Sequence, residues 1–183
     1  MGDDAVAEFE RCVATLRTNP GPATRALLAL REDARGLEVA RDVLSRSRDD
    51  EARFHAVALF RDGALRRWAE LAPGDRTGCA DLALAFCAAL PPDAPPFLAA
   101  SAARCFAALW ARGFADAASG PAAVSAARAA QAVECVLAAA AGRADAASRL
   151  LAALLDELGA GRTALGVSNA RRAAAKHRFG GAG

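Results

Sequence analysis

The chain has 183 residues, of which 54% are hydrophobic, and its 23 basic and 21 acidic side chains leave a formal net charge of +2. This length suffices for one ordinary domain with a sizeable core. Because acids and bases are interleaved, no strong field attracts nucleic acid or a membrane surface, and no charge-free apolar run reaches the ~18 residues of a transmembrane helix.

Proline and glycine divide the chain into segments in which apolar residues recur at helical spacing. The first four predicted helices cover residues 3–17, 22–32, 37–47 and 49–71. The next four cover residues 76–90, 97–112, 121–141 and 143–158. Asp49 or Asp50 is the expected N-cap of the fourth helix, and Gly113 is the expected C-cap of the sixth. No alternation of apolar and polar residues typical of strands occurs.

Eight helices joined by short breaks predict four antiparallel hairpins over residues 1–158. The second helices of the last two hairpins begin near residues 96 and 143. Their separation matches one repeat of HEAT and armadillo arrays, which is ~40–47 residues long. The sequence therefore predicts an all-α fold, a HEAT-repeat-like α-solenoid in which broad apolar faces contact neighbouring repeats. Residues 159–183 are expected to form a linker, a weak basic helix and a disordered glycine-rich end.

Two tryptophans, Trp68 and Trp110, lie late on apolar helix faces and are expected to anchor the core. The cysteines are odd in number, lack a CxxC pair and have no histidine at ligand spacing; they are Cys12, Cys79, Cys87, Cys105 and Cys135. We therefore expect reduced, mostly buried thiols in a cytosolic or nuclear protein, and no metal site. The acidic start of the chain is unlike a signal peptide.

No combination of residues predicts catalysis. His55 follows Phe54 on a predicted helix, where a structural or solvated role is expected, and His177 lies in a basic tail. The segment 159–163 resembles a phosphate-binding loop only superficially, since no strand precedes it. The basic residues of 171–178 are interpreted as a frayed end in preference to a phosphate or acidic-partner site. These features favour a binding protein without cofactors, and not an enzyme.

The order of several short motifs, from about residue 9 to 179, resembles the amino-terminal region of nuclear export receptors of the importin-β superfamily, in particular the exportin 4 and exportin 7 group. The motifs are Leu65-Arg66-Arg67-Trp68, Arg112-Gly113, the leucine-rich segment 150–158, and then Thr163, Gly166, Ser168, Lys176 and Phe179. Two positions depart from the family: Arg171-Arg172 stand where it has phenylalanine and histidine, and Gly159-Ala160-Gly161 replaces a serine linker. The family continues through many more repeats, so we expect a fragment or a shortened relative of such a receptor.

The resemblance implies that these repeats bind the GTPase Ran in its GTP form, and that a full-length receptor carries protein cargo past nuclear pore proteins between nucleus and cytoplasm. It places the contact surface on the concave wall formed by the second helix of each hairpin, where position alone selects Asp62, Arg66, Arg104, Arg149 and Asp156 as exposed candidates. Two alternatives stay open. One is a helical protein-interaction scaffold that does not bind Ran. The other is a nucleic-acid binder that uses the arginines, which the near-neutral charge disfavours.

Overall fold

The computed structural model describes residues 2–117 and 122–157, and this part of the chain is helical with no strand. Seven helices are followed by a further helical segment at 144–157; the seven are α1 (Gly2–Thr15), α2 (Pro20–Glu32), α3 (Gly36–Arg46), α4 (Asp50–Arg66), α5 (Pro73–Ala89), α6 (Pro96–Ala117) and α7 (Ala122–Ala139). The predicted all-α class is therefore confirmed. The weak basic helix and glycine-rich end predicted after residue 158 lie outside the described residues.

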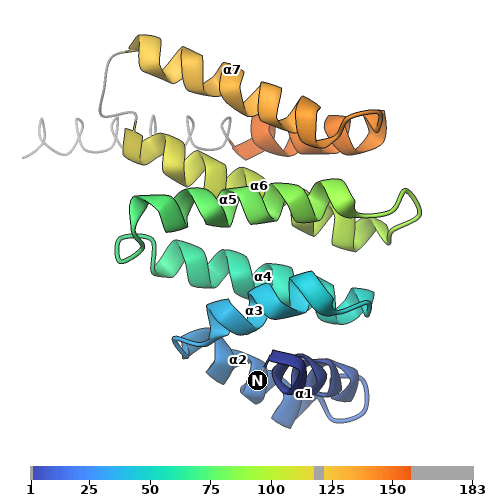
Figure 1. Ribbon diagram of the computed structural model, residues 1–183. Coiled ribbons are helices and arrows are strands. Elements are labelled where there is room, and N and C mark those ends of the chain that lie inside the picture. The colour runs from blue at the N-terminus through green and yellow to red at the C-terminus, as the bar shows by residue number, and fades with distance from the viewer. Residues whose placement is uncertain (1, 118–121, 158–183) are drawn as a thin grey trace, which may run out of the picture.

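The helices lie one above another, from α1 and α2 at one end of the molecule to α7 at the other (Figure 1). Helix α3 packs chiefly on α4, α5 packs on α6, and α4 and α6 join these two pairs. The rings of Phe54 in α4 and Phe97 in α6 meet edge to face at a centroid distance of 5.3 Å. Helix α1 departs from this pattern, because it packs more extensively on α3 than on α2, its neighbour in sequence.

One continuous apolar core runs through the stack. Its largest fully buried side chains are Phe60, Phe106, Leu90, Leu98, Leu109 and Leu150. Trp68 is 2% exposed, which confirms its predicted place in the core, whereas Trp110 is only partly buried at the edge. None of the described helices combines the length and the apolar character that crossing a bilayer requires.

The prolines explain why α2 and α5 begin earlier than predicted. Pro20 and Pro73 are the first residues of these helices, whereas the sequence prediction placed both prolines in the preceding turn. Proline suits this position because its fixed φ is already helical and the first N–H of a helix has no partner within it. At α4, Asp49 is the N-cap, and its carboxylate accepts a hydrogen bond of 2.7 Å from the Ala52 amide.

The predicted ends of α4 and α6 are wrong. Helix α4 stops at Arg66, and Trp68 lies in the turn that follows, where the Arg76 guanidinium donates to the carbonyl groups of Ala69 and Leu71 at 3.3 and 3.0 Å. Helix α6 continues through Gly113. A glycine that caps the C-terminus of a helix needs a positive φ, and among the described residues only Gly142 has one, so Gly113 is not a C-cap.

Candidate functional site

Two of the five predicted contact residues, Asp62 and Arg66, serve to hold α2 on α4. Asp62 pairs with Arg31 at 2.5 Å and with Arg61 at 3.2 Å, and its side chain is only 19% exposed. Arg66 is exposed and pairs with Glu32 at 2.6 Å. The expectation that Asp62 is exposed is therefore wrong, because its carboxylate packs against arginines of its own chain.

The other three predicted residues lie further along the chain and do not join them. Arg104 is exposed on α6, and its Nε donates to the Ala100 carbonyl at 3.3 Å. Arg149 is partly buried, against expectation, and pairs with Asp145 at 3.6 Å, while Asp156 is exposed. Within the described residues no ion pair or hydrogen bond links any of the five to another.

The structure instead has a groove at the end of the stack, between α1, α2 and α3. It exists because α2 is rich in small residues and buries only Ala23 fully, so that apolar surface between the three helices is left uncovered. The groove encloses about 380 Å³. We call it the end groove; it is lined by Ala5, Glu8, Phe9, Cys12, Ala26, Leu27, Leu30, Arg35, Glu38, Val39 and Asp42.

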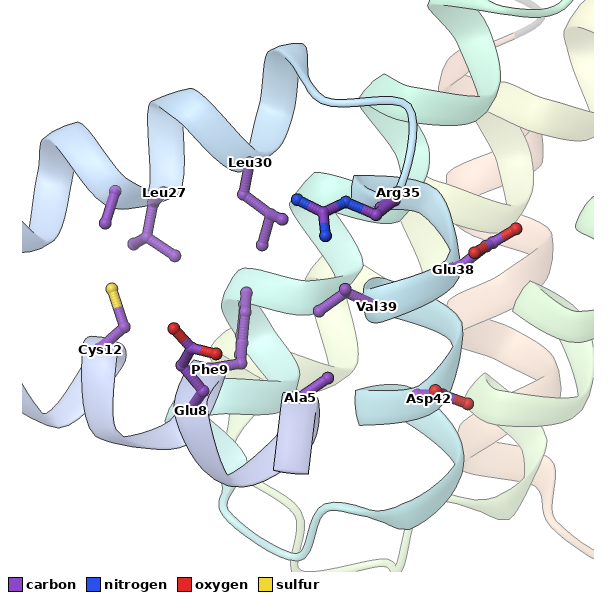
Figure 2. A pocket seen from close by; sticks show the side chains of 11 residues that line it. Ala5, Glu8, Phe9, Cys12, Leu27, Leu30, Arg35, Glu38, Val39 and Asp42 are labelled. Atoms are coloured by element: carbon purple, nitrogen blue, oxygen red, sulfur yellow. The ribbon is translucent and has the colours of Figure 1, made fainter. Parts of the chain in front are cut away.

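Apolar side chains form the interior of the end groove. Figure 2 shows Leu27 and Leu30 pointing from α2 toward α1, with Phe9 and Val39 on the other side. Phe9 is 3% exposed and belongs to the core, while Leu27, Leu30 and Val39 are partly buried and pack against it. The apolar surface left uncovered here is of the kind that takes an apolar ligand group.

The Cys12 thiol lies at one end of the groove and is partly exposed. Its Sγ is 3.6 Å from the Ala23 carbonyl oxygen. Burial, and then the negative charge of Glu8, raise the pKa of this thiol above its usual value. Because the thiolate is the reactive form of cysteine, this shift lowers the reactivity of Cys12 near neutral pH.

Carboxylates dominate the charged residues around the groove, with Glu8 on α1 and Glu38 and Asp42 on α3. The one basic lining residue, Arg35, is held by Asp33 through hydrogen bonds of 3.0 and 3.3 Å. This side-chain hydrogen bond from Arg35 lowers the pKa of Asp33. Asp42 lies 3.6 Å from Arg46, whereas Glu8 and Glu38 form no ion pair with any described residue.

A second depression of about 320 Å³ lies between the α2–α3 turn and the end of α4. Its charges are largely satisfied within the chain: Arg66 pairs with Glu32, and Arg67 pairs with Glu70 at 3.3 Å and donates to the Ala34 carbonyl at 3.0 Å. These contacts tie α2 and the turn to α4. The depression is therefore better explained as part of the scaffold than as a ligand site.

The described residues offer no arrangement typical of catalysis. No three His, Cys, Asp or Glu side chains among them are placed to hold a metal ion. His55 lies edge to face against Phe54, and burial lowers its pKa. Burial raises the pKa of Cys87 to about 11 and of Cys105 to about 12, so neither supplies a thiolate near neutral pH.

The five cysteines are free, and Cys79, Cys87 and Cys105 are buried as predicted. Cys12 is partly exposed and Cys135 is exposed; since the other three are buried, the prediction of mostly buried cysteines is confirmed. Sequence reasoning also missed the end groove. The available signal was the composition of residues 20–32, where alanine, glycine and proline leave too few large side chains to seal α2 against two neighbours.

Comparison with known proteins does not identify a family for this chain. No protein-family model matches the sequence, and no curated protein or solved structure is significantly similar to it. The described part of the chain is a stack of helices with an open, apolar groove at one end, and carboxylates lie along the rim of this groove.

Proposed function

We propose that this chain is a protein-interaction module whose end groove binds an amphipathic helix of a partner protein. The observation that carries the proposal is the partly uncovered apolar interior formed by Leu27, Leu30 and Val39 between three helices. An amphipathic helix that lays its apolar face into such a groove is a recurrent mode of recognition. The groove's volume, about 380 Å³, is near the small end of the range for ligand pockets and suits a few anchoring side chains.

Two leucines of α2 provide a matched test. Leu30 lines the groove, whereas Leu28 is 50% exposed and does not line it. A synthetic amphipathic helix of about 15 residues with a leucine face serves as the probe. Leu30→Ala should weaken its binding roughly tenfold, since a buried apolar contact of about 1.4 kcal/mol is lost, while Leu28→Ala should leave the dissociation constant unchanged.

The cysteines supply an independent footprint of the bound peptide. Cys12 lines the groove and Cys135 is exposed on α7, on a part of the chain that does not line it. Bound peptide should slow alkylation of Cys12 and leave alkylation of Cys135 unchanged. Equal rates at both thiols with and without peptide, together with identical binding by the two leucine variants, would refute the end groove as the binding site.

A second candidate function is the binding of Ran-GTP, which the motif order at Leu65–Trp68 and Arg112-Gly113 suggests. Three of the predicted contact residues are exposed, namely Arg66, Arg104 and Asp156. Ran loaded with GTP should then bind the chain more tightly than Ran loaded with GDP, because GTP orders segments that are released on hydrolysis. A pull-down with each nucleotide form tests this, with Arg104→Glu as the surface variant. Equal retention of both forms would leave the general interaction module as the function.

A further inference from the structure

Two carboxylates without an ion pair to the described residues lie beside the end groove. Elsewhere on these helices, several acids join one element to another: Asp3 pairs with Arg46 at 3.0 Å, and Glu51 pairs with Arg17 at 2.6 Å. Glu10 likewise accepts a hydrogen bond of 2.6 Å from the Ser47 hydroxyl. In contrast, Glu8 and Glu38 form no ion pair or side-chain hydrogen bond within the described part of the chain. These two carboxylates therefore do not join helices of the stack to one another.

These two carboxylates come from different walls of the groove, Glu8 from α1 and Glu38 from α3. Figure 2 shows the Glu8 carboxylate beside the opening between α1 and α2. Glu38 projects from α3, across the view from Glu8. The positive charge of Arg35 is paired with Asp33 at 3.0 Å and also interacts with the Glu8 carboxylate at longer range. The groove therefore presents an apolar interior with net negative charge on its border.

We infer that the partner helix is basic, with arginine or lysine residues flanking its apolar face and pairing with Glu8 and Glu38. This inference rests on the proposed function. The apolar stripe of an amphipathic helix is bordered by polar residues on both sides, which places basic side chains toward both walls. An acidic helix would bring like charges together as water is removed from the border, so the carboxylates also select against it.

Three synthetic helices test the charge preference. They share one leucine face and carry arginine, glutamine or glutamate at the flanking positions. In fluorescence anisotropy with the whole chain, the arginine helix should bind most tightly and the glutamate helix least tightly. The spread should shrink at about 1 M salt, where screening acts over roughly 3 Å.

Variants of the two carboxylates locate the preference. Glu8→Gln combined with Glu38→Gln should weaken the arginine helix about three- to tenfold and leave the glutamine helix unchanged, as expected for two border charge pairs. Both side chains are exposed, so the double variant should keep the helical circular dichroism of the parent. Asp93→Asn, which neutralises an exposed acid on the α5–α6 turn, is the matched control and should have no effect.

The outcomes separate this inference from the function on which it rests. If all three helices bind equally and Leu30→Ala weakens each of them, the groove stands and the inferred basic partner is overturned. If no helix binds, the proposed function and the inference both fail. A preference for the arginine helix that persists in the double variant would also overturn the assignment to Glu8 and Glu38.

Discussion

At the scale of single residues, the thiol of Cys12 reports the electrostatics of the end groove. Burial and Glu8 both raise its pKa. A polar alkylating reagent should therefore modify Cys12 more slowly than exposed Cys135 at neutral pH, and the Cys12 rate should rise with pH as the thiolate forms.

Glu8→Gln should accelerate labelling of Cys12, because removing a negative charge favours the thiolate and lowers the thiol pKa. Quantitative mass spectrometry of each modified peptide gives both rates, and Cys135 in the same sample is the internal control. A Cys12 rate that is insensitive to the Glu8→Gln change would show that the carboxylate does not reach the groove.

Two glycines should respond to alanine in opposite directions. A Cβ on Gly36 would lie 2.1 Å from the Leu30 carbonyl oxygen, which is backbone and cannot turn aside, so Gly36→Ala should cost about 1–3 kcal/mol of unfolding free energy. Gly78 lies inside α5 with open space around it, and Gly78→Ala should stabilise by about 0.5–1 kcal/mol. Urea unfolding of both variants measures this, and equal shifts would contradict the close approach of α2 and α3.

At the scale of elements, Arg143 joins the last helices to the middle of the stack. Its guanidinium donates to the Ala88 carbonyl at 2.8 Å and also to the carbonyl of Leu90, at the end of α5 where carbonyls have no helical partner. No sequence motif marked this residue, because its partners lie more than fifty positions earlier.

Arg143→Ala should destabilise the protein by about 1.5–3 kcal/mol, the usual range for hydrogen bonds to a charged group. Amide exchange should increase first in residues 130–157 and least in α3 and α4, whose contacts are untouched. Arg149→Ala removes a nearby arginine whose one ion pair with a described residue is to Asp145 at 3.6 Å, and it should have a much smaller effect. Uniform acceleration of exchange along the chain would mean that Arg143 acts on global stability and not on this junction.

At the scale of the whole molecule, Trp68 connects parts of the stack that are distant in sequence. It is 2% exposed in the turn after α4, and a Cβ on Gly113 of α6 would lie 3.6 Å from its Cζ2 atom. Trp68→Ala should cost about 3–5 kcal/mol, as for other large buried side chains.

Trp110→Ala should cost clearly less than Trp68→Ala, because Trp110 is only partly buried. Thermal unfolding followed by circular dichroism compares the two variants under identical conditions. If Trp110→Ala were the more damaging change, the core would be centred further along α6 than the buried residues indicate.

The helical class and much of the core follow from the sequence alone. Alanine-rich segments bounded by proline and glycine favour the helix through their local backbone preference. In such helices Phe60 and Leu109 fall on the apolar face, which predicts that they are buried. The exact helix ends did not follow, since Pro20 and Pro73 fit either a turn or a first helical residue.

Only the tertiary structure decided the end groove and the roles of Asp62 and Arg66. The groove exists because α1 packs more extensively on α3 than on α2, which buries only Ala23 fully. Periodicity is a local property and cannot say which helix a face contacts. Asp62 looked like an exposed residue until packing brought Arg31 to 2.5 Å. Such contacts join residues some thirty positions apart, so they form only when the helices pack and it is decided which apolar faces contact one another.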